Sequence, residues 1–112
     1  MQRYGQVIRI RPEKIDEYKK LHSSVWPEIK ALIAECHMMN YSIFLKDDLL
    51  FAYFEYTGTD FKSDMRKMAE NPVNKKWWAL CDPCQQPFET RAEGEWWANM
   101  EEVFYLGGVD KR

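Results

Sequence analysis

Residues 40–56 read NYSIFLKDDLLFAYFEY and hold two β-rich runs on either side of a charged turn. Asn40 to Leu45 and Leu49 to Tyr56 are rich in aromatic and aliphatic side chains, whereas residues 46–48 are all charged. Two such runs around a polar turn are typical of a β-hairpin whose turn points into water. The stretch therefore predicts two antiparallel strands in the middle of the chain.

The residues before this hairpin predict one strand and one interrupted helix. Residues 4–10 alternate in two phases, which is the period of a strand, and Pro12 ends the pattern. Across residues 13–36 the apolar side chains instead recur every three or four positions, as on one face of a helix. Pro27 cannot donate to the carbonyl four residues back, so we expect a kink or a helix restart near residues 23–27.

The residues after the hairpin predict a second helical region. Thr59 or Asp60 can cap a helix that continues for about ten residues, through Glu70. The Asn-Pro pair that follows interrupts it, and a further helical turn or two carries the tryptophan pair at residues 77–78.

The last third of the chain predicts a long loop and a closing strand. Proline and glycine interrupt residues 81–97, and an irregular loop of that length in a compact domain is more often functional than idle. Residues 100–106 then form a fourth strand. The order strand, helix, strand, strand, helix, strand is the split βαβ arrangement, in which helices cover one face of a four-stranded antiparallel sheet. The sequence therefore predicts the ferredoxin-like α+β class.

Apolar residues in both phases of the predicted strands indicate that both faces of the sheet are covered. Ile43 and Phe44 are one such pair of neighbours, and Tyr53 and Phe54 are another. Helices cover only one face, and the simplest cover for the other is a second copy of the chain packed sheet to sheet. We therefore expect a homodimer.

Length, charge and cysteine content exclude several classes of protein. The 112 residues suit a single domain over residues 1–112. Lys and Arg number 16 and Asp and Glu 18, so no basic excess exists to bind nucleic acid or an anionic membrane. No apolar run is long enough for a signal peptide or a membrane span. Three cysteines are an odd count that fits a reducing compartment, so we expect a cytoplasmic protein.

A small group of polar and aromatic residues has the spacing of a small-molecule site. Tyr18 and His22 are four residues apart, so both project from one face of a helix. That pair alone is explained equally well by a packed histidine that Tyr18 or a carbonyl satisfies. Tyr41 adds a phenol from a strand, and neighbours such as Trp77 and Trp78 point about 100° apart, so one of them is expected to face a cavity. Indoles beside Tyr and His suit a sugar, whose C–H face packs on the rings.

The remaining candidate motifs favour structural roles. Cys81 and Cys84 have the spacing of a redox dithiol or of half a zinc site, but a helix precedes the motif and a proline lies inside it. Zinc would also require Cys36 and His37 to converge on the same place. The second tryptophan pair, at residues 96–97, is expected to anchor the long loop.

Six short motifs stand in one order along the chain: Tyr18-x-x-x-His22, Val25-Trp26-Pro27-Glu28, Asn40-Tyr41-Ser42-Ile43-Phe44, Leu50-Phe51-Ala52, Trp77-Trp78 and Glu102-Val103-Phe104-Tyr105-Leu106. In these motifs, and over nearly its whole length, the sequence resembles the L-rhamnose mutarotase family. The resemblance implies a homodimeric ferredoxin-like α/β-barrel of the cytoplasm that interconverts the α and β anomers of L-rhamnose without cofactor or metal. It further implies that His22 is the catalytic proton donor and that Tyr18, Tyr41, Trp77 and Trp78 contact the sugar.

Three questions stay open at the level of sequence: the sugar, the base and the class of function. The loop at residues 81–97 departs from the family pattern, so the anomer chemistry is better supported than L-rhamnose as the particular sugar, and a related 6-deoxy or neutral aldose is the alternative substrate. If His22 is the acid that protonates the ring oxygen, the base is Tyr41, Tyr18 or a water held by Tyr18. A cofactor-free oxygenase of the same barrel type and a non-catalytic small-ligand binding module are the alternative functions.

Overall fold

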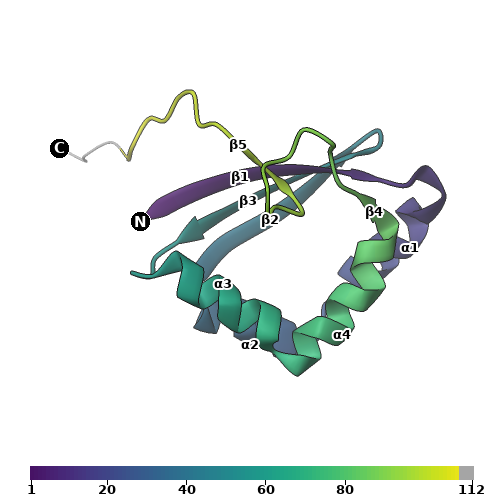
Figure 1. Ribbon diagram of the computed structural model, residues 1–112, viewed down its shortest axis with the longest axis horizontal. Coiled ribbons are helices and arrows are strands. Elements are labelled where there is room, and N and C mark those ends of the chain that lie inside the picture. Colours follow the sequence, from purple (N-terminus) through teal and green to yellow (C-terminus); the bar gives the residue numbers. More distant parts are fainter. Residues whose placement is uncertain (109–112) are drawn as a thin grey trace.

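The computed structural model describes residues 1–108 and shows a curled antiparallel sheet with its helices on one side (Figure 1). The strands are β1 (Gln2–Ile10), β2 (Met38–Lys46), β3 (Leu49–Tyr56), β4 (Gln85–Gln86) and β5 (Ala98–Met100). The helices are α1 (Ile15–His22), α2 (Pro27–Glu35), α3 (Phe61–Glu70) and α4 (Pro72–Cys81), with short 3₁₀ turns at Pro12–Lys14 and Asp82–Cys84. Within the described part of the chain, no helix has the length and apolar character needed to cross a membrane.

The order of the strands confirms the ferredoxin-like α+β prediction. β2, β3 and β1 lie side by side in that order, and both β4 and β5 pair with the free edge of β1. All four pairings are antiparallel. Two short pieces therefore share the position of the fourth strand, and the sheet has five strands where the sequence predicts four.

The prediction of a strand at residues 100–106 is wrong, because the pairing with β1 stops at Met100. The ladder sets Met100 opposite Gly5, and β1 begins at Gln2, so the residues beyond 103 have no part of that strand opposite them. The segment after β5 runs away from the helices and past the start of β1 (Figure 1). Its apolar side chains are solvent-exposed within this chain, with Val103 exposed to 89% and Phe104 to 79%.

The helix boundaries follow the signals in the sequence. The predicted interruption near Pro27 is a true break, since α1 ends at His22 and α2 begins with Pro27 at its first position. α3 is capped by Asp60, whose carboxylate accepts a hydrogen bond from the Ser63 amide at 3.1 Å. α4 begins at Pro72 and spans ten residues, which is longer than the predicted turn or two.

The core lies between the concave face of the sheet and the helices. One cluster comprises Ile8, Ile10, Tyr18, Ile29, Leu50, Trp77, Cys81 and Cys84. A second comprises Leu32, Cys36, Met38, Phe54, Tyr56 and Met68. In β3 the buried residues alternate with half-buried ones, so one phase faces the helices and the other faces outward. The site described next lies against both clusters.

Candidate active site

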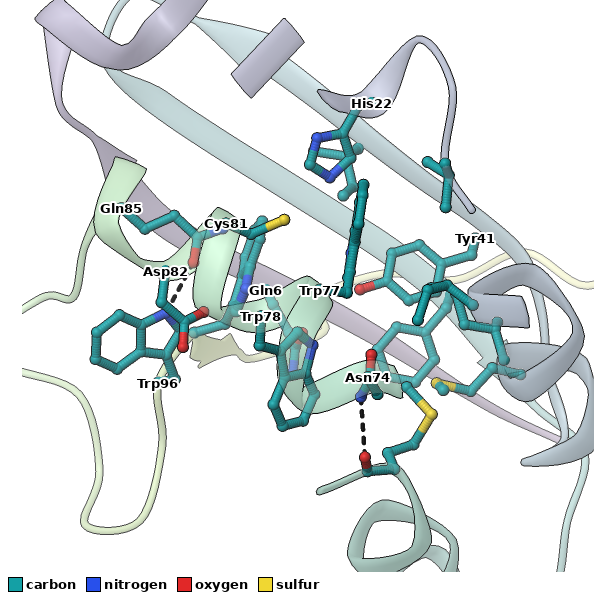
Figure 2. Close-up of a pocket in the computed structure, with 18 of the residues that line it drawn as sticks. Gln6, His22, Tyr41, Asn74, Trp77, Trp78, Cys81, Asp82, Gln85 and Trp96 are labelled. Atoms are coloured by element: carbon teal, nitrogen blue, oxygen red, sulfur yellow. Dashed lines mark hydrogen bonds between the residues drawn. The ribbon is translucent and has the colours of Figure 1, made fainter. Parts of the chain in front are cut away.

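A cavity of about 770 Å³ lies between the sheet and the helices, and its lining includes every site residue predicted from the sequence. Its volume is in the range of small-molecule binding pockets. α1 contributes Tyr18 and His22, β2 contributes Tyr41, and α4 contributes Trp77 and Trp78. Figure 2 shows His22 and Tyr41 on the two sides of Trp77, with Trp78 further along α4. Residues up to 60 positions apart in the chain therefore share one chamber.

The helix spacing of Tyr18 and His22 stacks their rings, with centroids 4.0 Å apart. Nδ1 of His22 lies 2.9 Å from the main-chain carbonyl oxygen of Tyr18. A carbonyl oxygen only accepts, so Nδ1 carries a hydrogen and donates it. This bond fixes the orientation of the imidazole and leaves Nε2 free for proton transfer.

Burial lowers the pKa of His22 below its ordinary value, while its hydrogen bond to the Tyr18 carbonyl acts in the opposite direction. His22 is therefore largely neutral at pH 7, and Nε2 carries a lone pair in the resting state. If His22 is the acid that the sequence predicts, its imidazolium must form during the reaction. This refines the sequence-based expectation, which rested on the ordinary pKa of histidine.

A short relay of hydrogen bonds orients the Tyr18 hydroxyl. The Trp96 indole nitrogen donates to Oε1 of Gln85 at 2.8 Å. Because an indole N–H can only donate, this contact turns the amide nitrogen of Gln85 toward Tyr18, whose hydroxyl oxygen it reaches at 3.1 Å. The oxygen of Tyr18 is thus used as an acceptor, and its own hydrogen remains available to donate to a ligand.

Both tyrosines are held in the neutral form. Burial raises the pKa of Tyr18 well above its ordinary value, and burial also raises the pKa of Tyr41 to about 12. A phenol with a raised pKa is a poor base and a persistent hydrogen-bond donor. The two hydroxyls therefore suit the binding and orientation of sugar oxygens better than the removal of a proton.

The two tryptophans of α4 form different parts of the cavity wall. Trp77 is only 5% exposed and meets the rings of His22 and Trp26 edge to face, at centroid distances of 5.4 and 5.2 Å. Trp78 also lines the cavity but is 37% exposed. The sequence predicted that one of the pair faces a cavity, and both do.

Several cavity residues were not identified from the sequence. Gln6, Asn74, Asp82 and Gln85 all line the chamber, and burial raises the pKa of Asp82 above its ordinary value. The sequence indicates a functional loop at residues 81–97 from its length alone. Trp96, expected only to anchor that loop, both lines the cavity and bonds to Gln85.

The cysteines do not gather into one site. Cys36 belongs to one core cluster, whereas Cys81 and Cys84 belong to the other, so the two halves of a zinc site do not converge. Burial raises the pKa of Cys81 to about 12, which keeps its thiol protonated. Among residues 1–108, no three His, Cys, Asp or Glu side chains form a group able to hold a metal ion.

Fold and site together define a ferredoxin-like α+β protein with an aromatic, histidine-bearing cavity for a small polar molecule. A family model described as L-rhamnose mutarotase matches residues 3–106. The L-rhamnose mutarotase of Listeria monocytogenes is 35% identical over 108 residues, which cover 95% of this chain and 99% of that one. The chain belongs to the L-rhamnose mutarotase family.

Two solved structures share the fold, and the first of them is also a member of the family. The crystal structure of an L-rhamnose mutarotase from Formosa agariphila matches with a TM-score of 0.76 at 27% identity, covering 96% of this chain and 100% of the other. Tetracenomycin F2 cyclase from Streptomyces glaucescens, a polyketide cyclase, matches with a TM-score of 0.71 at 16% identity, covering 98% and 100%. The second likeness shows the fold alone, because one fold can carry unrelated chemistries.

Proposed function

We propose that this chain is a carbohydrate isomerase that interconverts the α and β anomers of L-rhamnose. Membership of the L-rhamnose mutarotase family over residues 3–106 supports the activity. The observation that carries the proposal is the partly buried imidazole of His22, whose Nδ1 bond to Tyr18 leaves Nε2 free beside the cavity. Indole and phenol rings surround that nitrogen, as expected for a neutral sugar.

In the proposed mechanism, His22 moves one proton between two oxygens of the same carbon. Nε2 accepts the proton of the anomeric hydroxyl, and the imidazolium so formed donates it to the ring oxygen. The bond between C1 and the ring oxygen breaks as the C1–O1 double bond forms, which gives the open-chain aldehyde. Rotation about C1–C2 exposes the other face of the aldehyde. Reclosure reverses the proton transfers, so the imidazole ends neutral and no proton is gained or lost.

The two phenols hold the sugar oxygens during these steps. The Tyr18 hydroxyl oxygen accepts a hydrogen bond from Gln85, so its one hydrogen is free to be donated. Tyr18 donates that hydrogen to a sugar oxygen close to His22. Tyr41, which stacks on Phe54 at 5.2 Å, donates from the sheet side of the cavity. Trp77 and Trp78 provide the apolar surface against which the pyranose C–H groups pack.

The lining of the cavity also suits a 6-deoxy sugar. Phe61, Met65 and Met68 of α3, together with Ile33 of α2, contribute apolar side chains to the chamber. A methyl group on C5 is buried favourably against such side chains, whereas a hydroxymethyl group would lose its hydrogen bonds to water. We therefore place L-rhamnose, or a closely related 6-deoxy aldose, ahead of ordinary hexoses.

Saturation-transfer NMR tests the activity because it measures the exchange between anomer signals directly. With the protein present, exchange of L-rhamnose is expected to exceed the uncatalysed rate, and other 6-deoxy aldoses are expected to exceed their hydroxymethyl counterparts. If the protein does not accelerate anomer exchange in L-rhamnose or in any other aldose tested, the proposed activity is wrong.

We also propose that two copies pack through the outer faces of their sheets. Phe44 of β2 is on the outward phase and is 65% exposed, and Met100 of β5 is 41% exposed. The apolar segment 103–106 extends beyond β1 without cover from this chain, which supports a partner that buries it. Sedimentation equilibrium is expected to give twice the chain mass, and Phe44→Glu is expected to shift it toward the monomer. A parent protein that is monomeric at micromolar concentration would contradict this arrangement.

The cytoplasm is the proposed compartment. All three cysteines are free and buried, and none is paired with another. Free thiols persist in a reducing compartment, which supports this assignment. Fractionation of the producing cells tests it, and recovery of the protein outside the cytoplasm would contradict it.

A further inference from the structure

Asn74, on the first turn of α4, is a polar residue with no exposed surface. Its backbone amide donates to the side chain of Asn71 at 2.9 Å, which caps the helix. Its side-chain nitrogen donates to the main-chain carbonyl oxygen of Met68 at 2.9 Å, which joins the end of α3 to the start of α4. These two bonds hold the residue in one orientation.

The other end of the Asn74 amide is left without a partner. Because the Met68 carbonyl only accepts, the amide cannot be turned around, and Oδ1 must point the other way. Oδ1 has no hydrogen-bond partner among the described residues. Figure 2 shows it directed away from Met68, to the side of the cavity where Trp77 and Tyr41 lie. Asn74 lines that cavity.

A buried acceptor without a partner is unfavourable, and native proteins rarely leave one unsatisfied. The missing partner must be a donor, and a sugar offers one on each hydroxyl. Asn74 precedes Trp77 by three residues, so it lies about 4.5 Å along the helix axis, on the same face. The ring of His22 contacts Trp77, and in the proposed mechanism the anomeric carbon lies next to His22.

From this geometry we propose that Asn74 is a specificity-determining residue, whose Oδ1 accepts a hydrogen bond from a ring hydroxyl remote from the anomeric carbon, on C3 or C4. The inference rests on the proposed binding of L-rhamnose in this cavity. Asn74 then has two roles: it recognises the sugar, and it joins the end of α3 to the start of α4 through its bond to Met68. Loss of Oδ1 removes the preference for a sugar that carries that hydroxyl.

The test compares L-rhamnose with its analogues that lack the hydroxyl on C2, C3 or C4. The parent protein is expected to bind either the C3 or the C4 analogue roughly threefold to tenfold more weakly than L-rhamnose, as for one hydrogen bond. Asn74→Leu keeps the number of side-chain heavy atoms while removing both polar atoms, and is expected to bind L-rhamnose and that analogue equally. Asn71→Ala is the matched control, because it disturbs the same corner through the lost cap and is expected to keep the parent's discrimination. A folded Asn74→Leu protein that keeps the parent's discrimination for all three analogues would overturn the proposal.

A second measurement on the unmodified protein applies even if Asn74→Leu does not fold. The side-chain amide NMR signals of Asn74 are expected to shift on titration with L-rhamnose and to shift less with the analogue that lacks the bonded hydroxyl. Shifts of the Trp77 and Trp78 indole signals with an unchanged Asn74 amide would overturn this inference alone. If neither the indoles nor Asn74 respond, the cavity does not bind the sugar, and both this inference and the proposed site are wrong.

Discussion

The two histidines of the chain occupy opposite kinds of environment. His22 is partly buried beside the cavity, stacks on Tyr18 and gives its Nδ1 hydrogen to a main-chain carbonyl. The side chain of His37 is 52% exposed and its Nδ1 lies 3.0 Å from a carboxylate oxygen of Asp64. The partner of the His22 ring is thus a neutral main-chain carbonyl, whereas the partner of the His37 ring is a side-chain carboxylate.

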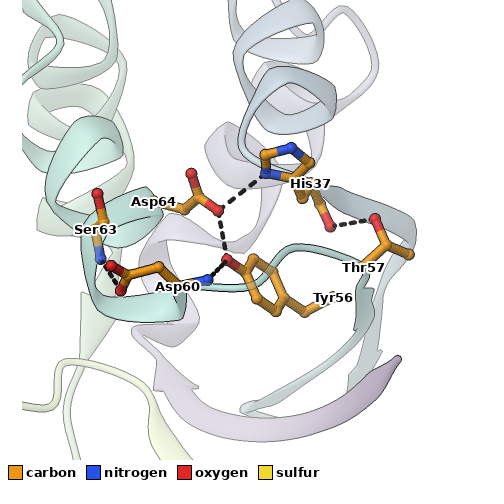
Figure 3. Close-up of polar contacts among 6 residues, drawn as sticks. All are labelled: His37, Tyr56, Thr57, Asp60, Ser63 and Asp64. Atoms are coloured by element: carbon orange, nitrogen blue, oxygen red, sulfur yellow. Dashed lines mark hydrogen bonds and ion pairs between the residues drawn. The ribbon is translucent and has the colours of Figure 1, made fainter.

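The cluster around His37 joins three elements at one end of the sheet (Figure 3). The Asp64 carboxylate of α3 accepts from the Tyr56 hydroxyl at the end of β3, and its other partner is His37, between α2 and β2. Thr57 completes the junction, because its backbone amide donates to the His37 carbonyl oxygen at 2.9 Å. His37 itself has a left-handed backbone with φ of 66°, which these contacts hold in place.

The difference shows what separates a reactive histidine from a structural one in this fold. Around His37 the polar atoms satisfy one another, Asp64 and Tyr56 are buried, and the half-exposed ring of His37 does not line the cavity. Around His22 a single hydrogen bond orients the ring, and Nε2 stays available next to a chamber that can hold a sugar. Residue type alone does not distinguish the two histidines. The hydrogen-bond partner of each ring and the presence of an adjoining cavity do distinguish them.

The largest effect is expected when each histidine is replaced by alanine. His22→Ala removes the proton-transfer group and is expected to slow anomer exchange by roughly 10²–10⁴-fold while the fold is kept. His37→Ala is expected to keep a rate close to that of the parent, with a lower melting temperature from the lost contact with Asp64. Saturation-transfer NMR on L-rhamnose measures both rates. Equal losses in the two folded variants would break the distinction drawn between the histidines.

A smaller effect is expected on sugar affinity when one wall of the cavity is removed. Trp78 is 37% exposed, so Trp78→Ala is expected to fold, and the loss of its packing surface is expected to weaken binding by about 1–2 kcal/mol. Leu80→Ala provides the control, because Leu80 lies on the same helix, is 42% exposed and does not line the cavity. Titration calorimetry with L-rhamnose measures the two affinities, and an unchanged affinity in Trp78→Ala would remove that indole from the site.

The smallest effect is expected in the cluster around His37, where replacing Asp64 changes the stability of the fold and leaves the rate of anomer exchange unchanged. The hydrogen bond from Tyr56, and then that from His37, lowers the pKa of Asp64. A lowered carboxyl pKa stabilises the fold above the unfolded-state pKa, and this contribution is lost as pH falls through the lowered value. Asp64→Asn is therefore expected to melt at a lower temperature than the parent at pH 7, with a difference that shrinks below about pH 4.

The control for Asp64→Asn is Asp47→Asn, in the exposed turn between β2 and β3. Asp47 has a φ of 55°, a backbone conformation that asparagine also tolerates. The Asp47→Asn protein is therefore expected to have the melting temperature of the parent. Thermal melts followed by circular dichroism between pH 3 and pH 7 provide the comparison. A melting difference for Asp64→Asn that does not change with pH would contradict the ionic account of the cluster.

The sequence predicts most of the fold because its signals are local. The change of period at Pro12, the break before Pro27 and the cap at Asp60 each act over a few residues, and each is confirmed. The strand at residues 100–106 is wrong for a non-local reason. Its apolar pattern is typical of a strand, but its pairing depends on β1 at the other end of the chain, and that pairing ends with Met100 opposite Gly5.

The site residues also divide into those with a local signal in the sequence and those without one. The five predicted residues, Tyr18, His22, Tyr41, Trp77 and Trp78, were selected by helix spacing, ring chemistry and family resemblance, and all line the cavity. Gln85 and Asp82 follow no periodic pattern, so only the folded loop brings them to the chamber. Asn74 left one signal in the sequence, its position three residues before Trp77 on the same helical face.

The pH dependence of anomer exchange shows whether His22 works from its neutral form, with Nε2 accepting the proton. Because burial lowers the pKa of His22, kcat/KM for L-rhamnose is expected to rise with pH to a plateau, with its midpoint below pH 6.5. The His37→Ala protein is expected to give the same profile, and the residual rate of His22→Ala is expected to lack this rise. A kcat/KM for the parent that falls as pH rises through this range, or a rise that survives in His22→Ala, would contradict the account.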